Sequence, residues 1–365
     1  RAGPDPVNSP TITEIATRRL RIPLQRPWGD SVQDVAVIAV TVRDSDGGIG
    51  QGFSWTPSIG AGAVQSLLDE DIRAFAVGQP IDDGLWQRSW AHLHEAGGGG
   101  VTTIALAGLD LAIWDLRARR QQVSVTTLLG RRHESLPCYG SGVNLHYSLE
   151  ELLAQVQRWI DAGHRAVKIK VGKPDLAEDL GRVQAVRALL GPYRQLMIDA
   201  NQRWTLDQAR RAAEAFAAFD IAWLEEPLRA DDLAGHVTLR SSTSIPIAVG
   251  ENLHTEYRFR DFIDAGAADV LQPNIIRVGG LTPFLAIAKL VRDRGKTLAP
   301  HLLPELSAQI AFSLPDPVWL EDVEDASFGA LGALNQPTGV TVQDGRVSGG
   351  PALGLGFDFQ EGFTA

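Results

Sequence analysis

The stretch AVKIKVG, residues 166–172, places two lysines inside an otherwise apolar and largely β-branched run. A short run of this kind is typical of a buried strand. Because side chains alternate between the two faces of a strand, Lys168 and Lys170 project to the same side. Two adjacent ammonium groups repel each other and lose hydration when buried, so a buried pair requires an anionic partner. The alternative is an edge strand whose lysines face solvent.

Strand-like runs recur at regular intervals from residue 136 onward. They cover residues 136–142, 166–172, 195–201, 221–227, 245–252, 269–274, 296–301 and 317–322. Helical patterns lie between them, and two of these begin with capping-box pairs, Ser148 with Glu151 and Thr205 with Gln208. Eight strands alternating with helices predict a (β/α)8-type barrel. No good amphipathic helix follows the eighth strand, where residues 338–350 instead predict a hairpin.

The first 135 residues have a different pattern. Residues 35–52 predict two strands around an Asp-Gly-Gly turn, and three helical stretches follow them. Strands first and helices after are typical of an α+β domain. We therefore expect an α+β domain over residues 12–130, a barrel over 136–325, and a C-terminal segment over 326–365 that returns to the first domain.

Composition narrows the class of protein. The 365 residues carry a formal net charge of −10, which argues against nucleic acid as a partner. No apolar run approaches the roughly 18–20 residues that span a bilayer, so we expect no membrane partner. Cys138 is the only cysteine, which excludes an intramolecular disulfide and fits a reducing cytoplasm.

Residues capable of chemistry stand where the predicted strands end, which is where such barrels carry their active sites. They are Lys168, Lys170, Asp199, Glu225, Glu251, Asn274, His301 and Glu321. A separation of 26 residues, one strand-helix unit, joins Asp199 to Glu225 and Glu225 to Glu251. Three converging carboxylates require a cation, and all-oxygen ligands favour Mg²⁺ before Mn²⁺ or Ca²⁺. A single strand-end carboxylate is more often a helix cap or a surface ion pair, but a set in register with the barrel indicates a site.

A metal ion that holds an anionic substrate would supply the charge that the two lysines require. A lysine partly desolvated beside such a metal is expected to have a lowered pKa and to be neutral near neutral pH, as a general base requires.

These residues carry a resemblance to a known family. The chain resembles the enolase superfamily, in its mandelate racemase subgroup, from about residue 12 to 360. The matching stretches are ALAGLDLAIWDLRAR (105–119), KIK (168–170), DANQRW (199–204), WLEEP (223–227), GEN (250–252), QPN and RVGG (within 272–280), APH (299–301) and VWLED (318–322). The resemblance implies a (β/α)7β barrel with an α+β N-terminal capping domain, and Mg²⁺ as cofactor.

The resemblance also implies a role for each residue. Asp199, Glu225 and Glu251 would bind Mg²⁺, while Glu226 would serve structure. Lys170 would remove the proton α to a substrate carboxylate. Lys168 would hold that carboxylate and depress the pKa of Lys170.

On the opposite face, His301 would be the acid or base. Glu321 would be a carboxylic acid hydrogen-bonded to the substrate carboxylate, and Asn201 would touch the hydroxyl side of the substrate.

One position departs from the family pattern. The sixth strand ends in Asn274, where most of the subgroup has an Asp that pairs with the histidine of the next strand. We expect the Asn274 carbonyl to accept a hydrogen bond from His301, which would leave His301 a weaker base. A racemase needs two competent bases, whereas a dehydratase needs one base and one acid. The asparagine therefore favours dehydration, although a change in specificity or a lost activity is also open.

The leading hypothesis is a Mg²⁺-dependent lyase that dehydrates a sugar acid to a 2-keto-3-deoxy acid. Residues 281–290 and 296–308 look like those of aldarate dehydratases. Family resemblance places specificity in two capping-domain loops, 26–31 and 54–62, where Trp28 would bind substrate; both could equally be ordinary surface loops. The alternatives are a racemase or epimerase of an α-hydroxy or N-acyl amino acid, and a non-catalytic barrel that binds a carboxylate. We also expect a homo-oligomer.

Overall fold

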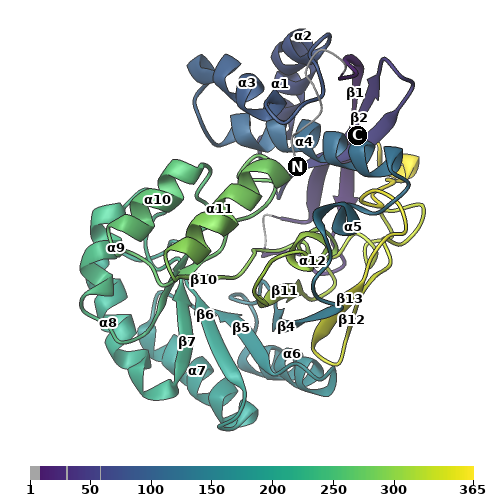
Figure 1. Ribbon diagram of the computed structural model, residues 1–365. Helices are drawn as coiled ribbons and strands as arrows, with labels where there is room; N and C mark the ends of the chain where they lie inside the picture. Colours follow the sequence, from purple (N-terminus) through teal and green to yellow (C-terminus); the bar gives the residue numbers. More distant parts are fainter. Residues whose placement is uncertain (1–8, 30–31, 58) are drawn as a thin grey trace.

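The structure is a computed structural model, which describes residues 9–29, 32–57 and 59–365. Figure 1 shows an N-terminal domain of helices and a small sheet above a larger domain of parallel strands ringed by helices. The small sheet is antiparallel, in the order β1-β2-β3, with bounds β1 Ile12–Pro23, β2 Asp34–Asp44 and β3 Ile49–Thr56. Helix α4 (Val101–Arg120) packs on this sheet and buries its apolar residues against it. The two strands predicted around the Asp-Gly-Gly turn are confirmed as β2 and β3, whereas the sequence pattern had not indicated β1.

The remaining helical segments of the N-terminal domain precede and follow α4. Their bounds are α1 Ala61–Leu67, the π-helical turn η2 Leu68–Ile72, α2 Arg73–Ala76, α3 Leu85–His92, the 3-10 turn η3 His94–Ala96 and α5 Val125–Leu129.

The larger domain contains all eight predicted strands. Their bounds are β4 Ser135–Ser141, β5 Ala166–Lys170, β6 Gln195–Asp199, β7 Ile221–Glu225, β8 Ile247–Val249, β9 Val270–Leu271, β10 Thr297–Leu298 and β11 Leu320–Val323. They pair in parallel from β4 through β10 in sequence order, and β11 pairs with the free side of β4. The prediction of a (β/α)7β barrel with an α+β N-terminal domain is confirmed.

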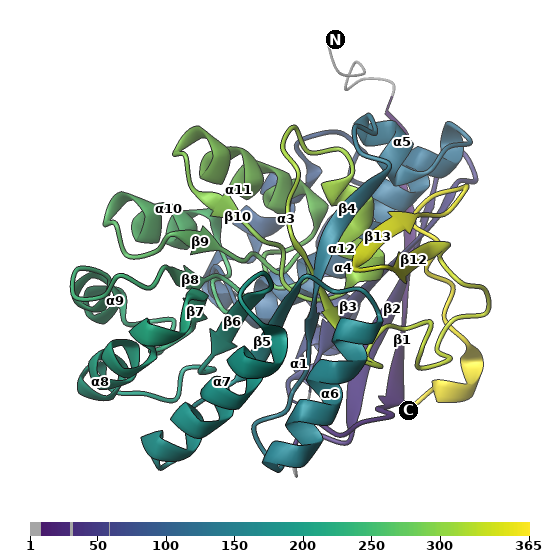
Figure 2. The same cartoon turned by 90° about the horizontal axis from the view of Figure 1, so that it is seen from below.

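Helices cover the outside of these strands (Figure 2). Their bounds are α6 Leu149–Asp161, α7 Leu176–Leu190, α8 Leu206–Phe216 with the 3-10 turn η4 Ala217–Phe219, α9 Leu233–Arg240, α10 Glu256–Asp264, α11 Leu281–Asp293 and α12 Pro304–Ala311. Both predicted capping boxes are present: Ser148 with Glu151 begins α6, and Thr205 with Gln208 begins α8. Each box satisfies backbone donors that would otherwise lack a partner at the start of the helix.

The predicted hairpin is present, but it does not itself return to the N-terminal domain. It consists of β12 (Val340–Gln343) and β13 (Arg346–Gly349), and β13 pairs antiparallel with β4 of the barrel. Residues after the hairpin make the return, because Arg18 donates hydrogen bonds to the carbonyl oxygens of Phe359 and Gln360. A last 3-10 turn, η5 (Glu361–Phe363), ends this segment. The exact domain boundaries stay a prediction.

The barrel interior is filled by inward-facing side chains below its mouth. This layer consists of Tyr139, Ala166, Met197, Trp223, Ala248, Val270 and Ala299, each buried. A packed interior closes the barrel from below, so chemistry is confined to the end where the strands stop. Across residues 9–29, 32–57 and 59–365, no helix is both long and apolar enough to cross a membrane.

Candidate active site

The strand register places the charged side chains side by side at the carboxyl ends of the strands. Lys170 pairs with Asp199 across β5 and β6, and Asp199 pairs with Glu225 across β6 and β7. Glu251 follows β8 after one glycine. Ligand oxygens of Asp199, Glu225 and Glu251 all lie within 4.8 Å of one another, and all three residues are buried. The structure thus brings together the three carboxylates that were predicted to converge from their 26-residue separations.

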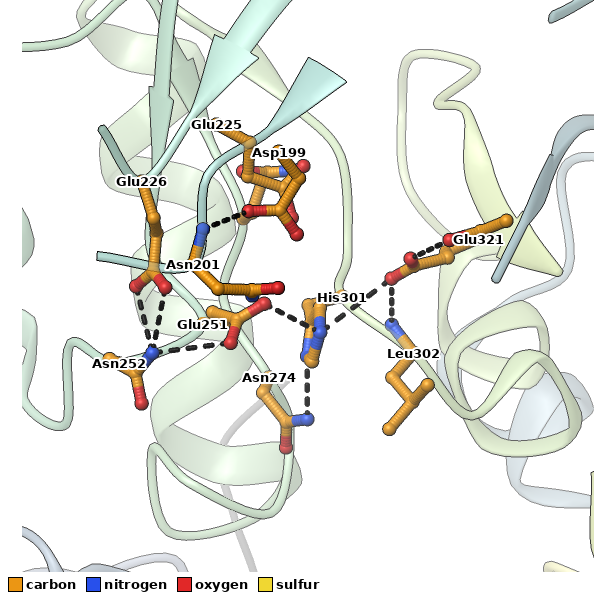
Figure 3. Close-up of polar contacts among 12 residues, drawn as sticks. Asp199, Asn201, Glu225, Glu226, Glu251, Asn252, Asn274, His301, Leu302 and Glu321 are labelled. Atoms are coloured by element: carbon orange, nitrogen blue, oxygen red, sulfur yellow. Dashed lines mark hydrogen bonds and ion pairs between the residues drawn. The ribbon is translucent and has the colours of Figure 1, made fainter. Parts of the chain in front are cut away.

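The backbone turns sharply just beyond these strand ends. Asn201 (φ 42°), Gln202 (φ 62°) and Glu226 (φ 39°) occupy the left-handed region, which non-glycine residues rarely adopt. The backbone N–H of Asn201 donates to Oδ1 of Asp199 at 2.8 Å, which fixes this carboxylate over the barrel. Figure 3 shows the Asn201 side chain extending toward Glu251, in keeping with its predicted place in the site.

Both lysines are buried and paired. Strand β5 lies between β4 and β6, and Lys168 is 1% exposed, so the alternative of a solvent-facing edge strand is wrong. Lys168 Nζ lies 2.6 Å from Glu225 Oε1 and 2.8 Å from Glu321 Oε1. Lys170 Nζ donates to Oδ2 of Asp199. The anionic partners required by the lysine pair are therefore carboxylates of the same site.

The lowered pKa expected for Lys170 refers to the site with its metal bound and stays a prediction, while the protein's own charges act in the opposite direction. Burial disfavours its ammonium form, but Asp199, Glu251 and Glu225 together outweigh burial and the repulsion from Lys168, so the pKa of Lys170 is raised. The pKa of Lys168 lies well above its ordinary value because Glu225 and Glu321 outweigh its burial.

Glu225 shows that the lysines do not fully balance the acidic cluster. Burial, followed by repulsion from Asp199, Glu321 and Glu251, outweighs the attraction of Lys168 and raises the pKa of Glu225 to about 7. A carboxylate that resists ionisation beside two others is a position where a cation would relieve repulsion. The donor set is all carboxylate oxygen, which suits a hard divalent ion such as Mg²⁺. The residues therefore fit the predicted metal.

Glu321 differs from its predicted state. It was expected to be a protonated acid, but both of its oxygens accept hydrogen bonds, from the Ser141 hydroxyl at 2.7 Å and the Leu302 amide at 3.0 Å. Burial opposes its ionisation, but the ammonium groups of Lys168 and Lys170 outweigh burial and lower the pKa of Glu321. Glu321 is therefore a carboxylate that holds Lys168 in place.

His301 stands between three of the polar groups at the barrel mouth (Figure 3). Its Nε2 lies 2.8 Å from Glu251 Oε2 and 3.7 Å from Glu321 Oε2. Its Nδ1 lies 3.0 Å from Nδ2 of Asn274, the amide nitrogen. The expectation that the Asn274 carbonyl accepts from His301 is therefore wrong.

The orientation of the Asn274 amide is set by the turn that follows it. Oδ1 of Asn274 accepts hydrogen bonds from the backbone amides of Ile276 at 3.0 Å and Arg277 at 3.1 Å. Turning the amide over would leave the buried amide of Ile276 and the partly buried amide of Arg277 facing an NH2 group. Each buried donor that loses its partner costs about 1–3 kcal/mol. The oxygen therefore faces the turn, and the NH2 group faces His301.

Several supporting residues were not predicted. Gln272 Nε2 donates to Glu225 Oε2 at 2.6 Å, and the amide of Asn252 donates to both oxygens of Glu226, at 2.8 and 2.9 Å. Arg277 donates to the backbone carbonyl of Glu251 at 3.1 Å. Asn252 directly follows Glu251 in GEN, and Gln272 stands two residues before Asn274 in QPN, so position within these motifs was the available signal.

The predicted substrate contact of Trp28 stays a prediction. Trp28 packs edge-on against Trp55, with ring centroids 6.2 Å apart, so the two predicted specificity loops meet. Residues 30, 31 and 58 of these loops lie outside the described residues.

Comparison with protein families gives matches to two domain families that together cover most of the chain. Residues 11–130 match the N-terminal domain of mandelate racemase and muconate lactonizing enzyme, and residues 151–362 match the enolase C-terminal domain-like family. The chain belongs to the enolase superfamily. The predicted resemblance to its mandelate racemase subgroup is confirmed.

Among relatives in this superfamily, the chain is 37% identical to 3,6-anhydro-alpha-L-galactonate cycloisomerase of Streptomyces coelicolor, over 96% of this chain and 98% of the relative. It is 34% identical to L-talarate/galactarate dehydratase of Salmonella typhimurium, over 96% of this chain and 86% of the relative. A solved structure of L-talarate dehydratase from Polaromonas sp. JS666, complexed with Mg and L-glucarate, superposes with a TM-score of 0.88 at 34% identity and covers 98% of both chains.

Proposed function

We propose that this protein is a Mg²⁺-dependent lyase that removes the proton α to the carboxylate of a sugar acid and then eliminates the β-hydroxyl group, giving a 2-keto-3-deoxy acid. The observation that carries the proposal is the register of β5, β6 and β7, which sets Lys170 directly beside a cluster of three carboxylates. A base held next to a cation site is the arrangement that proton abstraction α to a carboxylate requires.

Asp199, Glu225 and Glu251 would hold the metal, which when bound stabilises the negative charge that develops on the substrate carboxylate. Lys168 adds a fixed positive charge, held between Glu225 and Glu321. Lys170 Nζ in its neutral form takes the α-proton, so the C–H bond breaks and its electrons move toward the carboxylate. A cation held by Asp199, Glu225 and Glu251 would offset the negative charge that raises the pKa of Lys170 and so favour the neutral form. His301 faces the same space from the other side and hydrogen-bonds the substrate through Nε2.

The substrate class follows from the relatives, which include the dehydratases of L-talarate, galactarate, arabinonate and L-rhamnonate. A second candidate, cycloisomerisation, is favoured by 37% identity to a cycloisomerase of an anhydro sugar acid. It shares the α-proton abstraction and differs in that a ring oxygen leaves in place of a hydroxyl group. Racemisation remains the alternative if both faces of the carbon meet a base.

The proposal is tested by screening purified protein with Mg²⁺ against mono- and diacid sugars, scoring 2-keto acid formation. Activity should disappear with EDTA, and Lys170→Ala should lose about 10²–10⁴-fold in kcat. Lys289→Ala is the matched control, because that side chain is exposed on α11 and, among the described residues, forms its ion pair with Asp293, one turn further along the helix. If Lys170→Ala kept its ligand affinity and the wild type showed no turnover of any acid, the non-catalytic barrel would be the better account.

Assembly as a homo-oligomer, the absence of a nucleic-acid partner, and a cytoplasmic location stay predictions. Measuring the mass of the protein in solution tests the first of these.

A further inference from the structure

We infer that Asn274 holds His301 as the Nε2–H tautomer, so that His301 donates a hydrogen bond to the substrate and never acts as a base. The inference deepens the proposed function, because it assigns all proton abstraction in this site to Lys170.

The first step of the argument is the direction of one hydrogen bond. Asn274 is fully buried, and its Oδ1 is occupied by the amides of Ile276 and Arg277. Its NH2 group is therefore the part that faces Nδ1 of His301, at 3.0 Å. An NH2 group can only donate, so Nδ1 must present its lone pair.

The second step concerns the other ring nitrogen. A neutral imidazole carries one hydrogen, and the partner of one nitrogen decides which nitrogen holds it. With Nδ1 as an acceptor, the hydrogen lies on Nε2, the nitrogen that faces Glu251 and Glu321 at the barrel mouth. This assignment uses only the Asn274 side of the ring, so it does not depend on what the carboxylates bind.

The third step is the consequence for chemistry. A nitrogen that already bears a hydrogen has no lone pair with which to take a proton from carbon. An aspartate at position 274 would do the opposite: its second oxygen would accept Nδ1–H and leave Nε2 free as a base, as the aspartate does in Ser-His-Asp triads. Asn274 is thus a positioning residue that allows chemistry from one face only.

The proton balance of the proposed elimination then runs through one side chain. Lys170 takes the α-proton as the C–H bond breaks. The ammonium group so formed returns a proton to the departing hydroxide as the C–O bond breaks, so that water leaves and Lys170 is again neutral. His301 keeps its Nε2 hydrogen throughout and only donates a hydrogen bond.

The first test needs no substrate. Protein labelled with ¹⁵N-histidine and supplied with Mg²⁺ is measured by long-range ¹H–¹⁵N NMR, and the His301 signals are assigned from their loss in His301→Gln. The wild type should show hydrogen on Nε2 and an acceptor Nδ1, and Asn274→Asp should reverse the pattern. Hydrogen on Nδ1 in the wild type would overturn the inference.

The second test uses L-talarate and, separately, galactarate in D₂O with Mg²⁺. The wild type should give no α-epimer of either acid, even where deuterium enters with retention of configuration. Asn274→Asp should form a deuterated α-epimer at a rate at least about 10²-fold above that of the wild type. Asn335→Asp, which adds the same charge at an exposed position, should behave as the wild type.

The two ways of failing are distinguishable. If neither acid reacts with any variant, the proposed substrate class is wrong, but the NMR assignment still decides the tautomer. If the wild type forms the α-epimers, His301 acts as a second base and the inference is wrong, while the lyase site remains.

Discussion

At the scale of single residues, the site is governed by a charge imbalance that burial makes severe. Lys168 and Lys170 face Asp199, Glu225, Glu251 and Glu321 in a space closed to water from below. The excess of negative charge is evident at Glu225, whose pKa is raised to about 7 by burial and by its carboxylate neighbours. In such a place a divalent cation and a proton compete for the same carboxylate.

This competition predicts how stability depends on pH. The pKa of Glu225 is about 7 in the folded protein and has its ordinary value of 4.5 in the unfolded chain. Between these two pH values, Glu225 is protonated in the folded protein but ionised in the unfolded chain. Without Mg²⁺, the free energy of unfolding should therefore fall as pH rises through this window, by up to about 3 kcal/mol from this group. Glu321 has a lowered pKa and so changes stability only below this window.

Melting temperatures with EDTA and with Mg²⁺ check this prediction across the window. Stabilisation by Mg²⁺ should be larger at about pH 8 than at about pH 5, because the ion binds the ionised carboxylates. Glu225→Gln should reduce the decrease in melting temperature that is measured in EDTA as the pH rises. A stabilisation by Mg²⁺ that is independent of pH would contradict it.

The sequence predicted which side chains meet, but not how their protons and hydrogen bonds are arranged. Lys170, Asp199 and Glu225 could be selected because each ends a strand, and the barrel period brings strand ends together. The raised pKa of Lys170 and the ionised state of Glu321 depend on the balance of several neighbours at close range. The direction of the Asn274 amide depends on a turn whose backbone geometry no residue pattern specifies.

At the scale of elements, the turn that orients Asn274 is supported from the N-terminal domain. Asp110, in the middle of α4, accepts hydrogen bonds from the Thr282 amide at 2.9 Å and its hydroxyl at 2.6 Å, and so caps α11. Trp86 in α3 donates to the Gly279 carbonyl at 2.8 Å. A Cβ at Gly280 would lie 2.4 Å from the Asp110 carboxylate, so this close approach requires glycine. Sequence periodicity located α4 and α11, but not this contact between them.

Removing the Asp110 carboxylate should therefore weaken the contact between α4 and α11. Asp110→Ala removes the acceptor of the partly buried amide and hydroxyl of Thr282 and should lower the free energy of unfolding by about 1–3 kcal/mol. Urea unfolding measures the loss. Asp83→Ala is the control, because the Asp83 carboxylate is 81% exposed in a surface ion pair with Arg117 and should cost less than about 1 kcal/mol. If both variants lost the same free energy of unfolding, the contact between α4 and α11 would contribute little to stability.

At the scale of the whole molecule, the C-terminal segment fastens the barrel to the N-terminal domain. After the hairpin on β4, the chain runs back beside β1 and β3, where the yellow end lies along the small sheet in Figure 1. Phe357 and Phe359 pack there against Phe53 of β3, with ring centroids 4.8 and 5.4 Å away, and Phe328 completes the cluster at 5.4 Å. The sequence predicted the return, but the pairing of the hairpin with β4 is a long-range contact that local pattern does not specify.

Phe53 is the centre of this cluster and is fully buried, so its replacement tests the fastening directly. Phe53→Ala should lower the free energy of unfolding by about 3–5 kcal/mol, because it removes ring contacts to three partners and leaves a cavity between the two domains. Hydrogen exchange should rise in β1, β3 and residues 357–364 before it rises in β5–β7. The control is Phe75→Ala, whose ring is partly buried and stacks on His92 within the N-terminal domain. That variant should leave exchange in residues 357–364 unchanged; a rise there equal to that in Phe53→Ala would mean that the cluster does not specifically join the domains.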